Sequence, residues 1–149
     1  MRNEVRFIVK GEPQGKGRPR IMASYNAEEK KVHGWARTPE KTVVYENLVK
    51  MEYGRQCKDQ RFPDEAMLDM RIFAYYGIPK SKSKKIKQMM REKALRPIKK
   101  PDMDNVVKVI ADSLNGVAYR DDTQIVDQMC RKFYSDEPRV EVVIRQIGE

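Results

Sequence analysis

Alternation of apolar and polar side chains marks several short stretches of the chain as strands. Residues 5–10 alternate and are rich in β-branched and aromatic side chains, which is typical of a strand with one buried face. Residues 67–76 repeat the pattern over a longer stretch with several aromatics, so we predict a long strand there, near the centre of the sheet. A short segment near residues 31–36 is expected to pair with the first strand.

The C-terminal part of the chain carries the same signal twice. Residues 124–134 and 139–147 are rich in β-prone side chains, and a turn-forming segment at residues 135–138 separates them. Because a short turn joins two such segments, we predict that they form a closing β-hairpin.

Apolar side chains spaced three and four residues apart predict a helix in the first half of the chain. A threonine, a proline and a glutamate at residues 38–40 supply an N-cap, a first-turn proline and an early acid. We expect the helix to extend to about residue 54 or 57, with Val44, Leu48 and Met51 as its core-facing stripe.

A second helix is predicted to begin at residue 102 or 103. Met103, Val107, Ile110 and Leu114 would form its apolar stripe, and Gly116 is its expected C-cap. A shorter helix with a basic outer face is predicted within residues 79–100, followed by an extended arm.

These elements follow one another as β, β, α, β, α, α, β, β, an order that predicts an α+β fold with a small mixed sheet. At 149 residues the chain has the usual size of one domain, so we expect a single domain over residues 1–149. Charged residues make up 36% of the chain and apolar residues 40%, which suggests a lean core. Either solvated helices or a partner subunit would account for this composition.

The charge balance indicates a polyanionic partner. Thirty-one Lys and Arg face 22 Asp and Glu, a formal net charge of +9. Residues 11–20 hold three glycines and two prolines together with Lys16, Arg18 and Arg20. This loop lacks the spacing of a Walker loop. It is either a solvated connection or a clamp on the backbone of DNA.

Residues 79–100 form the densest cationic run, with ten Lys and Arg against the single acid Glu92. Such a run is often a plain solvated face, but this one leads directly into a cluster of acids. Cations next to carboxylates are what a phosphodiester site requires. The candidate DNA-binding residues of the run are Lys82, Lys84, Lys85, Lys99 and Lys100.

Cysteine usage gives no sign of a zinc site. Cys57 and Cys130 are far apart and have only His33 as a nitrogen companion, so we expect free thiols in a reducing compartment. The N-terminal apolar run is too short for a signal peptide, and no segment approaches the roughly 18 apolar residues of a membrane span. These features favour a cytoplasmic protein.

Acidic residues gather around the second helix. Asp102 and Asp104 would share one side of an extended stretch, where they could hold one ion together. If the helix instead begins at residue 102 or 103, Asp104, Lys108 and Asp112 share its polar face. Carboxylates with a substrate phosphate are the ligands that Mg²⁺ prefers. Two alternatives remain open, namely helix capping by the first two aspartates and an ion pair between Lys108 and Asp112.

Asp121 and Asp122 follow a short connection after this helix. A pair of aspartates before a strand is also ordinary turn chemistry. Their carboxylates come beside those of the helix only if the next strand runs back along it, which the sequence does not determine.

Three blocks of the chain stand out as motifs, namely K-P-D-M-D-N-x-x-K at residues 100–108, D-S-L-N-G at 112–116 and D-D-T-Q-I at 121–125. Together they resemble the signature of the RusA-type Holliday junction resolvases, in particular their phage and prophage members. Residues 11–20, 37–46 and 79–85 add further similarity, so most of the chain is covered. The chain has proline before Asp102, where some members have arginine, so a cation at that place would come from Lys99 or Lys100.

The resemblance implies a homodimeric endonuclease of mixed α/β structure that requires Mg²⁺, with Mn²⁺ as a substitute. It would resolve four-way DNA junctions by paired symmetric nicks, in recombination and repair in the bacterial cytoplasm. The implied catalytic residues are Asp102, Asp104, Asp122 and Lys108. The three aspartates and Asp121 are the implied metal ligands, Asp121 being the less secure of its pair.

Two other interpretations fit the same sequence. A non-catalytic DNA-binding protein would use the aspartates only as helix caps and the basic surface for binding. A nuclease for other branched DNA would keep the chemistry and change the substrate. Neither needs a membrane or a small-molecule cofactor.

Overall fold

The computed structural model describes residues 3–148 as one sheet with helices, plus a separate two-stranded hairpin. Ten elements follow one another along the chain: β1 (Glu4–Lys10), β2 (Arg20–Asn26), β3 (Lys31–Arg37), α1 (Glu40–Cys57), β4 (Met67–Gly77), α2 (Lys84–Arg91), α3 (Met103–Ser113), the 3₁₀ turn η1 (Asp122–Gln124), β5 (Ile125–Ser135) and β6 (Arg139–Ile147).

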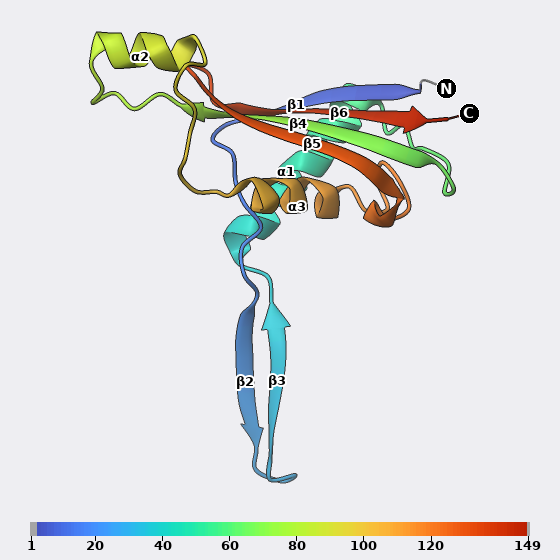
Figure 1. The fold of residues 1–149 in the computed structure, drawn as a ribbon. Helices are drawn as coiled ribbons and strands as arrows, with labels where there is room; N and C mark the ends of the chain where they lie inside the picture. The colour runs from blue at the N-terminus through green and yellow to red at the C-terminus, as the bar shows by residue number, and fades with distance from the viewer. Residues whose placement is uncertain (1–2, 149) are drawn as a thin grey trace.

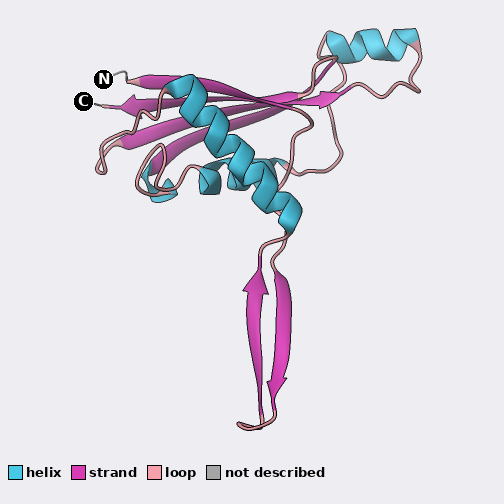
Figure 2. Cartoon of the chain, turned by 180° about the vertical axis from the view of Figure 1, so that it is seen from behind, coloured by secondary structure: helices cyan, strands magenta, loops and turns pink. Residues whose placement is uncertain are grey.

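The main sheet has the strand order β1-β6-β4-β5. β4 pairs with β6 in antiparallel and with β5 in parallel orientation, so the sheet is mixed and β4 lies inside it, as the sequence predicted. Helices α1 and α3 cover one face of this sheet, and α2 stands beyond one of its ends (Figures 1 and 2). The predicted α+β architecture is confirmed.

The predicted closing hairpin is wrong. β5 and β6 follow one another in the chain, but β4 lies between them in the sheet. Neighbouring strands are only about 4.8 Å apart, so a connection of about three extended residues can cross one strand. Residues 136–138 make this crossing at the end of β4. Alternating patterns predict strands but not which strands become neighbours.

The predicted partner of residues 31–36 is also wrong. β3 pairs with β2, a strand that the sequence analysis did not predict, and β1 pairs with β6 instead. The β2–β3 hairpin projects away from the sheet and helices (Figure 1). At its tip the side chain of Asn26 accepts hydrogen bonds from the backbone N–H groups of Glu28 and Glu29, which closes the turn.

Helix α1 has nearly the predicted limits, but it is rotated relative to the prediction. Tyr45, Val49 and Tyr53 are its buried apolar residues, and the ring of Tyr53 meets that of Phe7 on β1 edge to face at 5.4 Å. Val44 and Met51 of the predicted stripe are 62% and 61% exposed, and Leu48 is only partly buried. The helix carries two apolar stripes, and the one with the large aromatics faces the core.

Helix α3 forms the second helical support of the core. Ile110 and Leu114 are fully buried as predicted, and Val106 and Val109 join them. Val107 is only partly buried and Met103 is 39% exposed, so the real inward face lies one position away from the predicted one. The C-cap is Leu114, and Gly116 follows two residues later with a φ of +74°, in the left-handed region that glycine favours.

The predicted basic helix is present as α2. Met90 is its buried residue, and the side chain of Ser83 caps its first turn by accepting a hydrogen bond from the N–H of Ile86. The extended segment after it is fixed by Lys93 and Arg96, whose cationic groups each lie 4.6 Å from the ring centre of Phe133.

Two further expectations can be compared with the structure. Cys57 and Cys130 are free, as predicted. Within residues 3–148, none of the helices has the length and apolar character needed to cross a lipid bilayer.

Candidate active site

The outward side of α3 faces an open hollow that β5 closes from the other side. Asp104 and Lys108 lie on α3, and Asp122 lies just before β5; all three line this hollow, whose volume is about 370 Å³. The remaining lining residues are Val107, Ala111, Ile125, Val126 and Gln128. We call it the α3–β5 hollow.

The position of Asp122 follows from the direction of β5. Asp122 interacts with Asp112 near the end of α3, whereas Cys130, further along β5, interacts with Asp104 near its start. β5 therefore runs back along α3, which is the condition the sequence left open. The side chain of Asn115 accepts a hydrogen bond of 2.8 Å from the backbone N–H of Asp122, which fixes the turn before the strand.

The charged form of the Asp122 carboxyl group is disfavoured at its position in the fold. Partial burial raises its pKa, and the negative charges of Asp121 and Asp112 raise it further, together with a side-chain hydrogen bond to Asp112. Carboxylates that lie close together repel one another, and a bound cation offsets this repulsion. Such a position therefore favours the binding of a cation.

Asp121, the neighbour of Asp122, makes capping hydrogen bonds at the start of η1. Its carboxylate accepts hydrogen bonds from the backbone N–H and the hydroxyl group of Thr123, at 3.3 and 2.7 Å. The side chain of Gln124 completes a capping box around η1. These hydrogen bonds lower the pKa of Asp121. Of the two adjacent aspartates, the structure gives the capping role to Asp121 and leaves Asp122 at the α3–β5 hollow.

Asp102 lies at the start of α3, in a second hollow of about 510 Å³. It occupies the N-cap position, yet its side chain makes no capping hydrogen bond within the described helix, so the simple capping interpretation does not explain it. Arg18 and Lys100 line the same hollow. We call it the N-terminal hollow of α3.

The segment that leads into Asp102 is held by two side chains from the sheet. The hydroxyl group of Tyr76 on β4 donates to the carbonyl oxygen of Pro101 at 2.5 Å, and Nζ of Lys132 on β5 donates to that of Lys99 at 2.7 Å. Partial burial lowers the pKa of Lys132, although the nearby charge of Asp102 acts in the opposite direction. Lys132 therefore adds a further cation near Asp102, besides Arg18 and Lys100.

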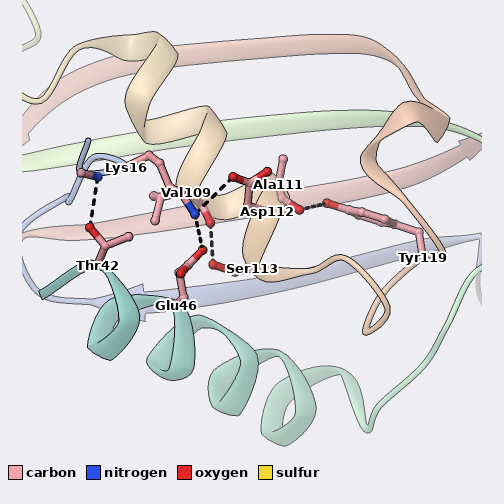
Figure 3. Close-up of polar contacts among 9 residues, drawn as sticks. Lys16, Thr42, Glu46, Val109, Ala111, Asp112, Ser113 and Tyr119 are labelled. Atoms are coloured by element: carbon pink, nitrogen blue, oxygen red, sulfur yellow. Dashed lines mark hydrogen bonds and ion pairs between the residues drawn. The ribbon is translucent and has the colours of Figure 1, made fainter. Parts of the chain in front are cut away.

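Lys16 joins the basic loop to both helices of the core. Its Nζ lies 2.9 Å from Oε2 of Glu46 on α1 and 3.4 Å from Oδ2 of Asp112 on α3 (Figure 3). Burial opposes its charge, but hydrogen bonds and attraction from the two acids outweigh that effect and raise its pKa. Lys16 thus fixes the loop in place, and the acid that pairs with it is Asp112, for which the sequence had suggested Lys108.

Glycine is required where this loop approaches α3. A Cβ atom on Gly15 would lie 2.9 Å from Cβ of Pro101 and 3.0 Å from Cβ of Asn105. The backbone N–H of Lys16 donates to the carbonyl oxygen of Asn105 at 3.0 Å. The loop is therefore packed against the start of α3, and this contact brings Arg18 to the hollow that contains Asp102.

The predicted site residues are thus divided between two adjoining places on α3. Asp104, Lys108 and Asp122 share the α3–β5 hollow, and Asp102 lies in the N-terminal hollow. The extended arrangement in which Asp102 and Asp104 share one side is wrong, because the helix begins at Met103. Among residues 3–148, no three carboxylate, thiol or imidazole groups are arranged to hold a metal ion.

The carboxylates at the α3–β5 hollow are of the kind that binds Mg²⁺. Mg²⁺ usually keeps several waters and is bound through one or two carboxylates together with phosphates of the substrate. Asp104 and Asp122 would supply two hard oxygen ligands at one hollow, which Lys108 also lines. A site of this kind is completed by the substrate rather than by a third side chain.

The predicted DNA-binding cations fall into separate groups. Arg18 and Lys100 line the N-terminal hollow of α3, and Arg20 lies at the base of the hairpin. The other exposed cations of the prediction are in or next to α2 and in the segment before α3, namely Lys82, Lys84, Lys85 and Lys99. α2 and the hairpin lie at opposite ends of the molecule (Figure 1).

Three supporting residues escaped the sequence analysis. Tyr76 and Lys132 lie inside alternating strand patterns, where nothing distinguishes a side chain that holds a loop from one that packs. Asn115 lies within a motif that carried the resemblance, so its position was marked although its role was not.

Comparison with known proteins agrees with these features. The chain matches the endodeoxyribonuclease RusA family over residues 10–145. It is also similar to the uncharacterized protein YqaN of Bacillus subtilis (strain 168), with 39% identity over 146 residues and 97% of each chain covered. The family match includes the whole of α3, both hollows and the basic loop. The chain therefore belongs to the RusA endodeoxyribonuclease family.

Proposed function

We propose that this protein is a Mg²⁺-dependent endonuclease that resolves four-way DNA junctions by paired symmetric nicks, acting as a homodimer in DNA recombination and repair. The observation that carries the proposal is the α3–β5 hollow, which Asp104, Lys108 and Asp122 line together. Membership of an endodeoxyribonuclease family supports the class of reaction.

Asp104 and Asp122 are the proposed metal-holding residues, and Asp102 would assist from the start of the helix. Mg²⁺ held there would neutralise phosphate charge and lower the pKa of a bound water, which are the two needs of phosphodiester hydrolysis. The raised pKa of Asp122 supports this assignment, because partial burial and the negative charges of Asp121 and Asp112 all disfavour its charged form, which a bound cation would stabilise. Mn²⁺, which also prefers oxygen ligands, is expected to substitute.

Lys108 is the proposed phosphate-contacting residue. Its side chain is exposed and lines the same hollow as Asp104 and Asp122, where its charge would attract a phosphate oxygen and stabilise the charge that develops on it. A histidine base is not part of the proposal, since the single histidine, His33, pairs with Glu29 on the hairpin.

The adjoining N-terminal hollow would hold the next phosphates of the strand. Arg18 and Lys100 line it, and Lys132 stands behind it on β5. Their charges would position the backbone without reading the sequence of the bases. A net charge of +9 supports binding of a polyanion over a wide surface.

The proposal is tested with a mobile four-way junction and mapped products. Asp104→Asn and Asp122→Asn should each abolish cleavage in Mg²⁺ while junction binding in Ca²⁺ stays within about threefold of wild type, because a single neutralised acid removes a metal ligand and no cation. The matched control is Asp64→Asn, an exposed acid that pairs with Arg61 far along the sequence from α3. It should cleave normally.

Each alternative has its own outcome. Binding of the junction without cleavage by the wild-type protein in Mg²⁺ or Mn²⁺ would establish a non-catalytic DNA-binding protein. Faster cleavage of flaps or forks than of four-way junctions would establish a nuclease for other branched DNA. Full cleavage by either aspartate variant would refute the proposed site.

A further inference from the structure

The side chains of the β2–β3 hairpin lie on two faces of different chemistry. Residues that face each other across an antiparallel pair lie on the same side of the ribbon, and side chains alternate along each strand. One face therefore carries four cross-strand pairs, namely Arg20 with Arg37, Met22 with Trp35, Ser24 with His33 and Asn26 with Lys31. We call it the Trp35 face. The other face holds only apolar or small side chains.

Two arginines face each other at the base of the hairpin without an acid between them. Arg20 lies directly opposite Arg37 in the register of the ribbon, and both residues are exposed. Among residues 3–148 neither guanidinium group forms an ion pair. Like charges opposite each other on two strands destabilise the ribbon. Because a bound anion removes this repulsion, the base of the hairpin favours phosphate.

Trp35 gives the same face a flat aromatic surface. It is the single tryptophan of the chain, and it is 48% exposed, although most large aromatic side chains are buried in a core or an interface. Its cross-strand neighbour is Met22, whose flexible thioether side chain suits contact with an aromatic ring. The described part of the chain leaves about half of Trp35 uncovered, so its ring is open to a ligand with a flat face.

The Trp35 face continues the cationic surface of the candidate active site. Arg18 lines the N-terminal hollow of α3, and only Pro19 separates it from Arg20. The hairpin projects on the side of the sheet that carries α1 and α3 (Figure 1). From the arginine pair to Trp35 the ribbon extends by two residues, about 7 Å, which is the rise of two base steps in DNA. A DNA strand that leaves the hollow can therefore reach the two arginines with its phosphates and Trp35 with a base.

A base can stack on Trp35 only where one of its two faces is uncovered. In a continuous duplex both faces of each base are covered by neighbouring bases. An unpaired base, or a base at the end of a stack where DNA strands branch, has a free face. Every base has such a face, and phosphate contacts carry no sequence information, so this surface would recognise the structure of DNA and not its sequence.

We propose that the Trp35 face binds DNA at a branch point, with one base stacked on Trp35 and phosphates held by Arg20 and Arg37. Trp35 is then a specificity-determining residue, because it favours branched or unpaired DNA over plain duplex and takes no part in hydrolysis. The phosphate-binding part is the base of the hairpin, since His33 already pairs with Glu29 near the tip. The inference rests on the proposed function for the identity of the substrate, but binding by this face requires neither Mg²⁺ nor cleavage.

The fluorescence of the single tryptophan is a direct test, because all tryptophan emission comes from Trp35. The protein is titrated in Ca²⁺ with a four-way junction, with a linear duplex of the same sequence and with a single-stranded oligonucleotide. Stacking on a base quenches tryptophan emission, so the junction and the single strand should quench it to saturation and the duplex only weakly. Binding of the junction without quenching, or equal quenching by the duplex, would overturn the proposal.

Two substitutions at one position separate stacking from plain apolar contact. Trp35→Phe keeps an aromatic face and should bind the junction within about threefold of wild type. Trp35→Leu keeps apolar bulk without that face, so it should bind the junction about tenfold more weakly and the duplex unchanged. The matched control is Tyr25→Leu, the same kind of change on the opposite face of the hairpin, which should keep the wild-type affinity. An equal loss in the control would contradict stacking on Trp35.

The arginine pair is tested through the salt dependence of junction binding. Arg20→Gln with Arg37→Gln should flatten this dependence by about 0.9 log unit per lost phosphate contact on duplex arms. Trp35→Leu should leave the slope unchanged, because stacking releases no counterions. The matched control is Arg55→Gln with Arg61→Gln, two arginines that already pair with acids, and it should keep the wild-type slope. An unchanged slope in the Arg20 and Arg37 variant would refute the assignment of phosphates to this face.

The rival occupant of the Trp35 face is another protein surface. In that case the emission of Trp35 would change with protein concentration in the absence of DNA and would not respond to the junction, a result that overturns the proposal. Cleavage assays in Mg²⁺ keep the two proposals apart. A protein that cleaves junctions without any change in Trp35 emission refutes this inference alone. A protein whose emission is quenched by junctions that it never cleaves refutes only the proposed nuclease.

Discussion

Replacing Asp122 by asparagine should stabilise the protein at neutral pH while it removes the proposed activity. The carboxylate of Asp122 is partly buried and stands beside the charges of Asp121 and Asp112, which raise its pKa. Asparagine has nearly the same shape and no charge, so the substitution relieves the repulsion and keeps the backbone hydrogen bond to Asn115. A residue held at a cost in stability is expected at a functional site.

The size of the effect is limited by solvent. Two unit charges about 4 Å apart repel by about 1 kcal/mol in water and about 4 kcal/mol at the effective dielectric constant near a protein surface. Because Asp122 is only partly buried and solvent screens its charge, we expect the lower end, about 0.5–1 kcal/mol. For a chain of 149 residues this corresponds to a rise in Tm of about 1–4 °C.

The pH dependence has a definite sign. The folded pKa of Asp122 is raised above its ordinary value of 3.8, so its protonated form favours the folded state, and that advantage is lost as pH rises through the folded pKa. Asp122→Asn should therefore be more stable than wild type at pH 7, and the difference should shrink as pH falls toward 3.8.

The neighbouring residue supplies the matched control. Hydrogen bonds from Thr123 lower the pKa of Asp121, so its charged form stabilises the fold at neutral pH. Asp121→Asn should lower Tm at pH 7, opposite in sign to Asp122→Asn. Thermal melts from pH 3 to pH 8 without divalent metal measure both. A lower Tm for Asp122→Asn at pH 7, or the same sign for both variants, would refute the electrostatic argument.

Three further predictions concern the surroundings of the site. Lys16→Met should lower the unfolding free energy by about 1–3 kcal/mol in urea titrations, because it leaves two partly buried carboxylates without their cation. Gly15→Ala should crowd the start of α3 and lower the stability by about 1–3 kcal/mol, so both Tm and the cleavage rate should fall. An unchanged thermal melt would contradict the close contact. Neutralising Lys82, Lys84 and Lys85 should flatten the salt dependence of DNA binding by about 0.9 log unit per lost phosphate contact, whereas an unaltered slope would show that these lysines only face solvent.

The sequence by itself determined the type of most elements and singled out the candidate residues of the site. Alternation gave β1, β4, β5 and β6, and apolar spacing with helix-start signals gave α1 and α3, because these periodicities are local properties of the chain. The sequence also marked the aspartates and Lys108 as candidates, because carboxylates beside cations stand out in a basic chain.

Only the tertiary structure decided which strands are neighbours and which side of a helix is inside. The order β1-β6-β4-β5 depends on pairing between segments far apart in sequence, which no local pattern encodes. Helix α1 carries two apolar stripes, and its core face was chosen by the packing of Tyr53 against Phe7. The outer stripe with Val44 and Met51 was left exposed.

Tertiary structure also decided the different roles of Asp121 and Asp122, the two aspartates after α3. In the sequence Asp121 and Asp122 are adjacent and chemically equal. In the folded chain Asp121 accepts hydrogen bonds from Thr123. Asp122 instead lies close to the negative charge of Asp112, because β5 runs back along α3. A side chain's role depends on what the folded chain brings to it from elsewhere, and that information exists only in three dimensions.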